Sequence, residues 1–93
     1  MPAKTDQAII EAARVFRNVD CRLVFRVLIR RPGITSEEIK MELDSPLPDM
    51  IRTLKYLVES GVAEEILHTP GSPALYGIRA LGLATFRQAT QLT

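Results

Sequence analysis

Residues 33–62 decide the fold, and they read GITSEEIKMELDSPLPDMIRTLKYLVESGV. Thr35 and Glu38 have the spacing of a capping box, in which the side chain of each residue bonds the backbone N–H of the other. Such a pair satisfies backbone donors that the first turn of a helix leaves without partners. The sequence therefore predicts a short helix that begins after Thr35 and covers residues 36–43.

A turn and a longer helix follow within the same stretch. Ser45 is a suitable cap, and Pro46 at the first helical position gives up only an N–H that has no helical partner there. Apolar residues then recur at the spacing of one helix face: Met50, Ile51, Leu54, Leu57 and Val58. Gly61 provides the stop, since glycine tolerates the left-handed conformation at a helix end. We therefore predict a helix over residues 46–60 with these five apolar side chains on its inner side.

The apolar period changes after this helix. Residues 62–68 alternate in the manner of a strand, the sequence Pro-Gly-Ser-Pro at 70–73 favours a turn, and residues 75–79 supply a second short strand. The two strands predict a hairpin over residues 62–79. Apolar residues at helical spacing follow, and they predict a final helix over residues 80–93.

Two further helices are predicted ahead of the quoted stretch. An amphipathic pattern predicts the first over residues 1–18, with Asn18 as its stop and Asp20 as the cap of the next helix. Residues 21–29 alternate in a way that also suits a strand, but the segment is long for a strand in so small a domain. We predict a helix there, so that a helical core, which includes the two helices and the turn at 36–60, covers residues 20–61. The expected fold class is α+β, mostly α.

The length and composition are those of one small globular domain. The chain has 93 residues, of which 46% are apolar and 25% charged, so wholesale disorder is not expected. No stretch reaches the roughly 20 apolar residues of a membrane span. The N-terminus lacks the pattern of a secretory signal. We therefore expect a cytoplasmic protein with no membrane partner.

Residues that carry chemistry are few. The chain has one cysteine, Cys21, and one histidine, His68. This pair cannot complete a four-ligand zinc site within one chain, and it offers no adjacent nucleophile and base. No glycine-rich phosphate loop is present either. We therefore expect no enzyme activity, no metal site and no cofactor. Cys21 has two interpretations, a buried small hydrophobe or a redox-active thiol.

Charge is distributed unevenly although the formal net charge is only +1. Residues 1–31 carry seven basic and three acidic side chains, residues 32–68 carry three basic and eight acidic ones, and residues 69–93 add two arginines. A chain that binds polyanions through bulk charge usually has a larger excess, so any phosphate binding must rely on a local patch. Three arginines share one edge of the predicted second helix, as either a phosphate-facing stripe or a solvent edge: Arg22, Arg26 and Arg30.

Two segments together resemble the winged helix-turn-helix of small prokaryotic transcriptional regulators. The first runs from GITSEEI at 33–39 to LKYLVESGV at 54–62, and the second is YGIRALG at 76–82. Together they cover about half of the chain. The resemblance implies a winged helix-turn-helix with extra N-terminal and C-terminal helices. It also implies sequence-specific binding of double-stranded DNA by a small homodimeric regulator.

The resemblance implies which residues face DNA. The helix over residues 46–60 becomes the recognition helix in the major groove, and residues 68–74 become the wing tip. Arg52 is the candidate for a base contact, because the fork of its guanidinium suits O6 and N7 of guanine. The expected DNA-binding residues are Ser45, Asp49, Arg52, Thr53, Lys55, Tyr56, Thr69 and Ser72.

Members of the resembling family often add terminal helices that pair two subunits. Apolar side chains lie on more than one side of the first helix here, and one small core covers only part of them, so we expect a homodimer. The expected interface residues are Ile9, Ile10, Phe16, Leu83, Phe86 and Leu92. Phe86 has a second interpretation, as part of the core of its own chain.

The sequence also leaves an alternative function open, a winged helix that binds proteins within a transcription or replication assembly. Pro46, Leu47 and Pro48 stand at the front of the recognition helix, where the resembling regulators usually carry polar side chains. The wing tip lacks the Arg or Lys that such regulators often place in the minor groove. The acidic balance of residues 32–68 also weakens electrostatic binding to DNA.

Overall fold

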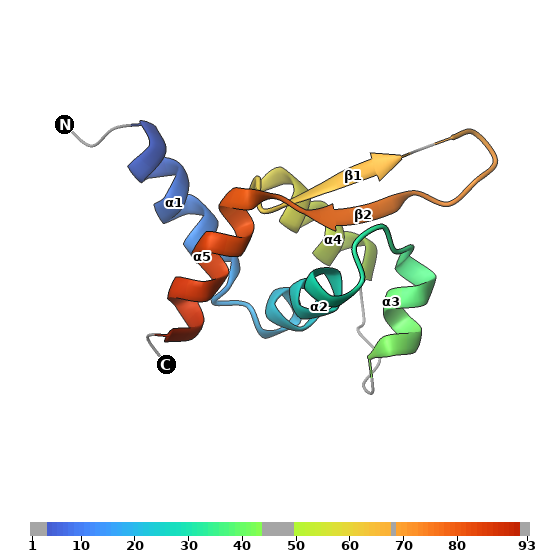
Figure 1. The fold of residues 1–93 in the computed structure, drawn as a ribbon, viewed down its shortest axis with the longest axis horizontal. Helices are drawn as coiled ribbons and strands as arrows, with labels where there is room; N and C mark the ends of the chain where they lie inside the picture. The colour runs from blue at the N-terminus through green and yellow to red at the C-terminus, as the bar shows by residue number, and fades with distance from the viewer. Residues whose placement is uncertain (1–3, 44–49, 68, 92–93) are drawn as a thin grey trace.

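The computed structural model describes residues 4–43, 50–67 and 69–91. Within these ranges the helices and strands follow in the predicted order, and the arrangement is a winged helix-turn-helix with a helix added at each end (Figure 1). The elements are α1 (Lys4–Val15), α2 (Val19–Arg30), α3 (Ser36–Glu42), α4 (Met50–Glu59), β1 (Ala63–Leu67), β2 (Leu75–Ile78) and α5 (Ala80–Gln91). The mostly helical α+β class and the winged-helix fold are thereby confirmed.

The junction between α1 and α2 differs from the sequence prediction. Helix α1 ends at Val15, and Asn18 caps α2 by accepting a hydrogen bond of 3.2 Å from the backbone N–H of Cys21. The prediction that Asp20 caps this helix was wrong. Asp20 lies in the first turn of α2, where its negative charge is still favourable near the helix N-terminus.

The wing is an antiparallel hairpin that is fastened to the helix-turn-helix. In its register Ala63 lies opposite Ile78 and Glu65 lies opposite Tyr76. The other edge of β2 is bonded to the loop before α3, because the N–H of Tyr76 donates to the carbonyl of Ile34 at 2.9 Å. The hairpin is therefore bonded to the loop before α3 near its base, while its tip extends away from the helices (Figure 1).

Three phenylalanines pack together in the core of the chain. Phe16, Phe25 and Phe86 have ring centroids 4.9 to 5.2 Å apart, two of the three pairs meeting edge to face. Phe16 is only 2% exposed and Phe86 only 8% exposed. These two were expected at a subunit interface, but their contacts within the protomer already cover them. The core interpretation of Phe86 is the one that the structure supports.

The start of α5 lies against the start of the hairpin. The N–H of Arg79 donates to the carbonyl of Val62 at 3.0 Å, and the backbone of Gly82 approaches the same peptide group. A Cβ atom at position 82 would overlap the Val62 carbonyl. Glycine is therefore required at this step into the last helix for close backbone approach rather than for an unusual backbone angle.

Cys21 is buried in the core formed around α2. Burial, with a smaller effect from the nearby Asp20 carboxylate, raises the pKa of its thiol from 9.0 to about 11. Because the thiolate is the reactive form, the thiol is inert at neutral pH. Of the two interpretations, the structure supports the buried small hydrophobe.

Candidate nucleic-acid interface

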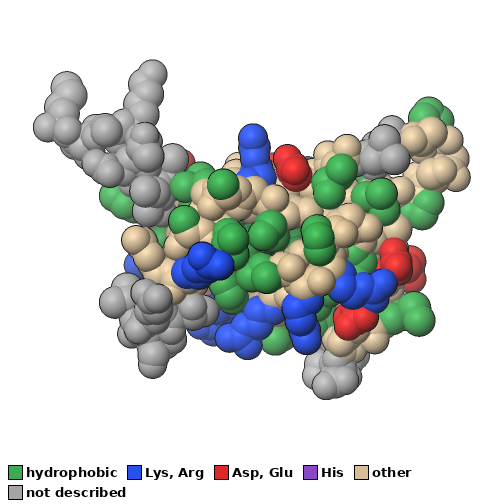
Figure 2. Space-filling model, in the orientation of Figure 1, with side chains coloured by type: hydrophobic (Ala, Val, Ile, Leu, Met, Phe, Trp, Pro, Cys, Tyr) green, Lys and Arg blue, Asp and Glu red, His purple; other side chains and the backbone are tan. Residues whose placement is uncertain are grey.

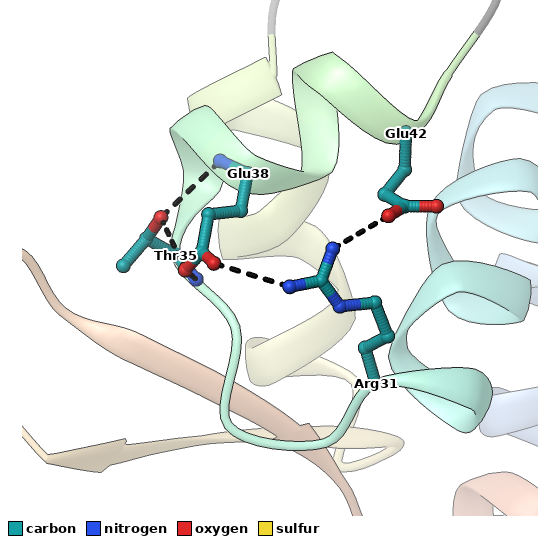
Figure 3. A network of polar contacts seen from close by, with 4 residues as sticks. All are labelled: Arg31, Thr35, Glu38 and Glu42. Carbon is teal, nitrogen blue, oxygen red and sulfur yellow. Dashed lines mark hydrogen bonds and ion pairs between the residues drawn. The ribbon is translucent and has the colours of Figure 1, made fainter.

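Arg31 links the end of α2 to α3, the helix that precedes α4. It follows the last residue of α2, and its guanidinium pairs with Glu38 and Glu42 of α3 (Figure 3). Lys40 pairs with Glu37 at 3.5 Å on the same helix. Arg31 carries one positive charge and offsets one acidic charge of residues 32–68, whereas the pair of Lys40 and Glu37 lies within that segment. The acidic balance of the segment therefore still weakens its electrostatic attraction to DNA.

The capping box at the start of α3 is present as predicted. The Thr35 hydroxyl accepts a hydrogen bond from the N–H of Glu38, and the Glu38 carboxylate accepts one from the N–H of Thr35, each at 3.2 Å (Figure 3). The hydrogen bonds from the Thr35 backbone and side chain, with a smaller effect from Arg31, lower the pKa of Glu38. The ionised carboxylate therefore contributes to fixing the end of α3 that faces the hairpin.

Helix α4 has an inner face and an outer face, and Ile51 lies on the outer one. Met50, Leu54 and Leu57 are buried as predicted. Ile51, which was predicted on the inner side, is 74% exposed, so that prediction was wrong. The reason is geometric: successive helical residues are about 100° apart, and the core covers an arc that ends between Met50 and Ile51.

The polar candidates on α4 are spread around the part of the helix that the core leaves uncovered, with Lys55 one turn after Ile51. Arg52, Lys55 and Tyr56 are exposed, and Thr53 is half-buried. Lys55 lies 4.0 Å from Glu59 one turn later, and Arg52 and Thr53 also interact with other groups of the chain. These side chains are accessible for contacts with a ligand, but the outer face of α4 is not a bare cluster of positive charge.

The loop at the wing tip places Thr69 and Ser72 at the surface. Both residues are exposed, and the N–H of Ser72 donates to the carbonyl of Thr69 at 2.9 Å. Their hydroxyl groups are of the kind that bonds phosphate oxygens. Ser45 and Asp49, the two remaining DNA-binding candidates, lie outside the described residues.

A hollow of about 240 Å³ separates α4 from the hairpin. It is lined by Ile51, Lys55 and Val58 from the helix and by Glu65 and Tyr76 from the strands. Partial burial, with a smaller effect from Glu65, raises the pKa of Tyr76. The phenol is therefore neutral at physiological pH. Its side chain lines the hollow on the side of the hairpin.

The structure describes the side chains of only two of the four remaining residues that were predicted at a dimer interface. Ile10 of α1 is 55% exposed and Leu83 of α5 is half-buried, on two helices that pack together. The side chain of Ile9 and all of Leu92 lie outside the described part of the chain. The dimer interface therefore stays a prediction.

The described ranges contain no helix long and apolar enough to cross a membrane. Within the same ranges, His, Cys, Asp and Glu side chains do not gather in a group of three or more that could hold a metal ion.

Two solved structures share this fold. MarR from E. coli in its apo form aligns over 96% of this chain and 67% of its own, with 26% sequence identity and a TM-score of 0.69. The PcaV transcriptional regulator from Streptomyces coelicolor, in complex with its natural ligand, aligns over 81% of this chain and 59% of its own, with 14% identity and a TM-score of 0.66. No protein-family model and no curated protein matches the sequence. The similarity confirms the expected winged-helix fold, and this chain spans about three fifths to two thirds of the two proteins.

Proposed function

We propose that this chain is a DNA-binding transcriptional regulator that inserts α4 into the major groove of double-stranded DNA. The observation that carries the proposal is the outer face of α4, where Arg52, Lys55 and Tyr56 are exposed beside an extended hairpin. An α-helix fits the major groove, and each base pair there presents a distinct pattern of donors and acceptors. The fold similarity to the transcriptional regulator PcaV supports the same function.

The polar residues of the interface have different proposed roles. Arg52 bonds a guanine edge, since a guanidinium can donate to O6 and N7 together. Lys55 and Thr53 bond phosphates and set the register of the helix on the duplex. Thr69 and Ser72 at the wing tip add phosphate contacts through their hydroxyl groups, and Tyr56 contacts the flank of the site.

The proposed regulator works as a homodimer. A single copy neutralises few phosphates, and binding that depends on few phosphates is weak. Pairing of two copies through α1 and α5 doubles these contacts and places two recognition helices in successive major grooves. The exposed side chain of Ile10 and the half-buried Leu83 on these packed helices support this route to a dimer.

The proposal is tested by selecting bound duplexes from a random pool and measuring the oligomeric state of the bound protein. Arg52→Ala is expected to weaken binding of the selected duplex by about 1–3 kcal/mol and to relax preference at one base pair. Lys55→Ala is expected to weaken all duplexes alike and to reduce the salt dependence. Arg17→Ala, which removes an exposed charge between α1 and α2, is the matched control. Failure to enrich any sequence would contradict the proposal.

A second candidate function is a protein-binding winged helix. The pairing of Lys55 with Glu59 and the lack of Arg or Lys at positions 69–74 favour it, because both reduce attraction to phosphate. Retention on a random duplex at about 50 mM salt separates the two functions, since electrostatic binding is strongest at low salt. No retention there, with the protein folded, would favour the protein-binding function.

A further inference from the structure

The outer face of α2 carries arginines and apolar side chains together. The residues of α2 that are not fully buried on this side form what we name the arginine face: Val19, Arg22, Leu23, Arg26, Ile29 and Arg30. Ile29 lies at the edge of the face and also packs against the core. The opposite side of the helix is buried, and from Val19 to Arg30 the face extends about 17 Å along the helix. Figure 2 shows Lys and Arg side chains gathered over the lower part of the molecule, where Figure 1 draws α2.

The positive charge of this face has no acidic counterpart among the residues that the structure describes. Among the described residues, no acidic side chain forms an ion pair with Arg22, Arg26 or Arg30. The ion-paired arginine of this region, Arg31, turns instead toward α3. Arg26 lies with its guanidinium carbon 6.0 Å from the centre of the Phe86 ring, a contact that orients the side chain without cancelling its charge.

Apolar surface is interleaved with these charges. Val19 is 56% exposed, and Leu23 is half-buried. Arg26, Ile29 and Arg30 line a shallow hollow of about 400 Å³, so one apolar and two positively charged side chains border the same hollow. A phosphate backbone would use the arginines only. A ligand that matches the whole face must offer both carboxylates and apolar side chains.

The arginine face and the outer face of α4 are both directed away from the core that α2 and α4 share. Helix α2 packs against α4, and the buried Leu28 of α2 and Leu54 of α4 belong to one core. The face of each helix that lies opposite this shared core is therefore directed away from the other helix. A duplex bound to α4 would therefore not cover the arginine face of the same protomer.

We propose that the arginine face is a docking surface for an acidic amphipathic segment of a partner protein. The segment forms a helix that lies along α2, places Asp or Glu side chains opposite Arg26 and Arg30, and seats an apolar side chain in the hollow over Ile29. Helix-on-helix binding of this kind uses apolar anchors at helical spacing. The guanidinium groups pair with carboxylates and exclude basic segments.

The test measures binding of a labelled synthetic peptide to the full chain by fluorescence anisotropy. The peptide has about 18 residues of Glu, Leu and Ala, with Leu along one helical face and Glu beside it. A scrambled peptide of the same composition keeps the charge but breaks the helical period. A random duplex of about two helical turns is the third probe.

Two pairs of substitutions have the same effect on net charge. Arg26→Gln with Arg30→Gln is expected to weaken binding of the helical peptide about tenfold, with binding of the random duplex unchanged. Arg14→Gln with Arg17→Gln, at exposed positions outside the face, is expected to leave binding of the peptide within about twofold. Val19→Ser is expected to weaken it about threefold, because a purely electrostatic ligand would not sense this change. Thermal unfolding monitors the fold of each variant.

Several results would overturn the proposal. Absence of peptide binding, equal binding of the scrambled peptide, or equal losses in both arginine pairs would each do so. If Arg26→Gln with Arg30→Gln weakens the duplex and not the peptide, the face binds nucleic acid instead. If the same variant changes the oligomeric state, a second copy of the chain covers the face. None of these results depends on whether α4 reads a DNA sequence.

Discussion

Helices α4 and α2 pack on one shared core, and their outer faces differ in whether the basic side chains have acidic partners. On α4, Lys55 has Glu59 beside it, and Arg52 also interacts within the chain. On α2, Arg26 and Arg30 are exposed with no acidic partner among the described residues. The most basic helix surface is therefore not the proposed recognition helix. Binding of DNA by α4 must depend on directed hydrogen bonds and on the wing, with bulk charge contributing little.

The largest expected effect comes from breaking the core that holds the two faces apart. Leu28 of α2 is fully buried, and Leu28→Ala is expected to lower the free energy of unfolding by about 2–5 kcal/mol, because it leaves a cavity. Urea unfolding followed by circular dichroism measures this loss. Met41→Ala is the control, since Met41 is 86% exposed and a change within about 0.5 kcal/mol is expected. A loss as small as the control's would mean that the helices do not share this core.

The next effect concerns the step from the wing into α5. Gly82→Ala is expected to lower the free energy of unfolding by about 1–3 kcal/mol, because the added Cβ overlaps the Val62 carbonyl. The sign is informative, since helix propensity alone favours alanine by about 1 kcal/mol. Gln88→Ala at an exposed position of the same helix is the matched control. A stabilising Gly82→Ala would show that α5 does not approach Val62 as described.

Removing the cap of α3 should affect the helix-turn-helix while leaving the arginine face intact. Thr35→Ala is expected to cost about 1 kcal/mol of stability, and Thr35→Ser much less, because serine keeps the capping hydroxyl. Hydrogen bonds from Thr35 lower the pKa of Glu38 below 4.5, so this stabilisation is present above pH 4.5 and declines as the pH falls through the lowered pKa. Unfolding at a series of pH values measures it. A difference between Thr35→Ala and wild type that grows in acid would contradict the capping role of Glu38.

The smallest effect tests what the unpredicted exposure of Ile51 does. If α4 lies in the major groove, we expect Ile51 to contact a thymine methyl group, as apolar side chains do there. Replacing one thymine of the selected duplex by uracil should then weaken binding by about 0.8 kcal/mol, roughly fourfold. Ile51→Ala should remove this preference for thymine. If the two proteins respond alike to uracil at every position, Ile51 makes no methyl contact, although the duplex is still bound.

The sequence predicted the elements that depend on local signals. The capping box of Thr35 and Glu38 involves residues three apart, and the position of Gly61 after α4 also acts locally, so both were visible without tertiary information. The cap of α2 was missed because it depends on where α1 ends, and either Asn18 or Asp20 can cap a helix. Residue type therefore gave the existence of the helix but not the residue at its start.

The sequence could not predict which residues at the edge of a helix face are buried. The period of α4 admits Ile51 on the inner side, and only the placement of α2 and the hairpin decides how wide the covered arc is. Phe16 and Phe86 were similarly ambiguous, because an apolar side chain is compatible with either a protomer core or a subunit interface. Both rings contact Phe25 of α2, Phe16 from the turn after α1 and Phe86 from α5, and these contacts place them in the core of the protomer.

The most direct test of DNA binding by α4 follows backbone amide signals by nuclear magnetic resonance as the selected duplex is added. We predict that signals of residues 50–59 and of the wing tip at 69–72 shift most, while those of α2 from Val19 to Arg30 change little. Shifts that concentrate on α2 and leave α4 unchanged would contradict the proposed recognition helix.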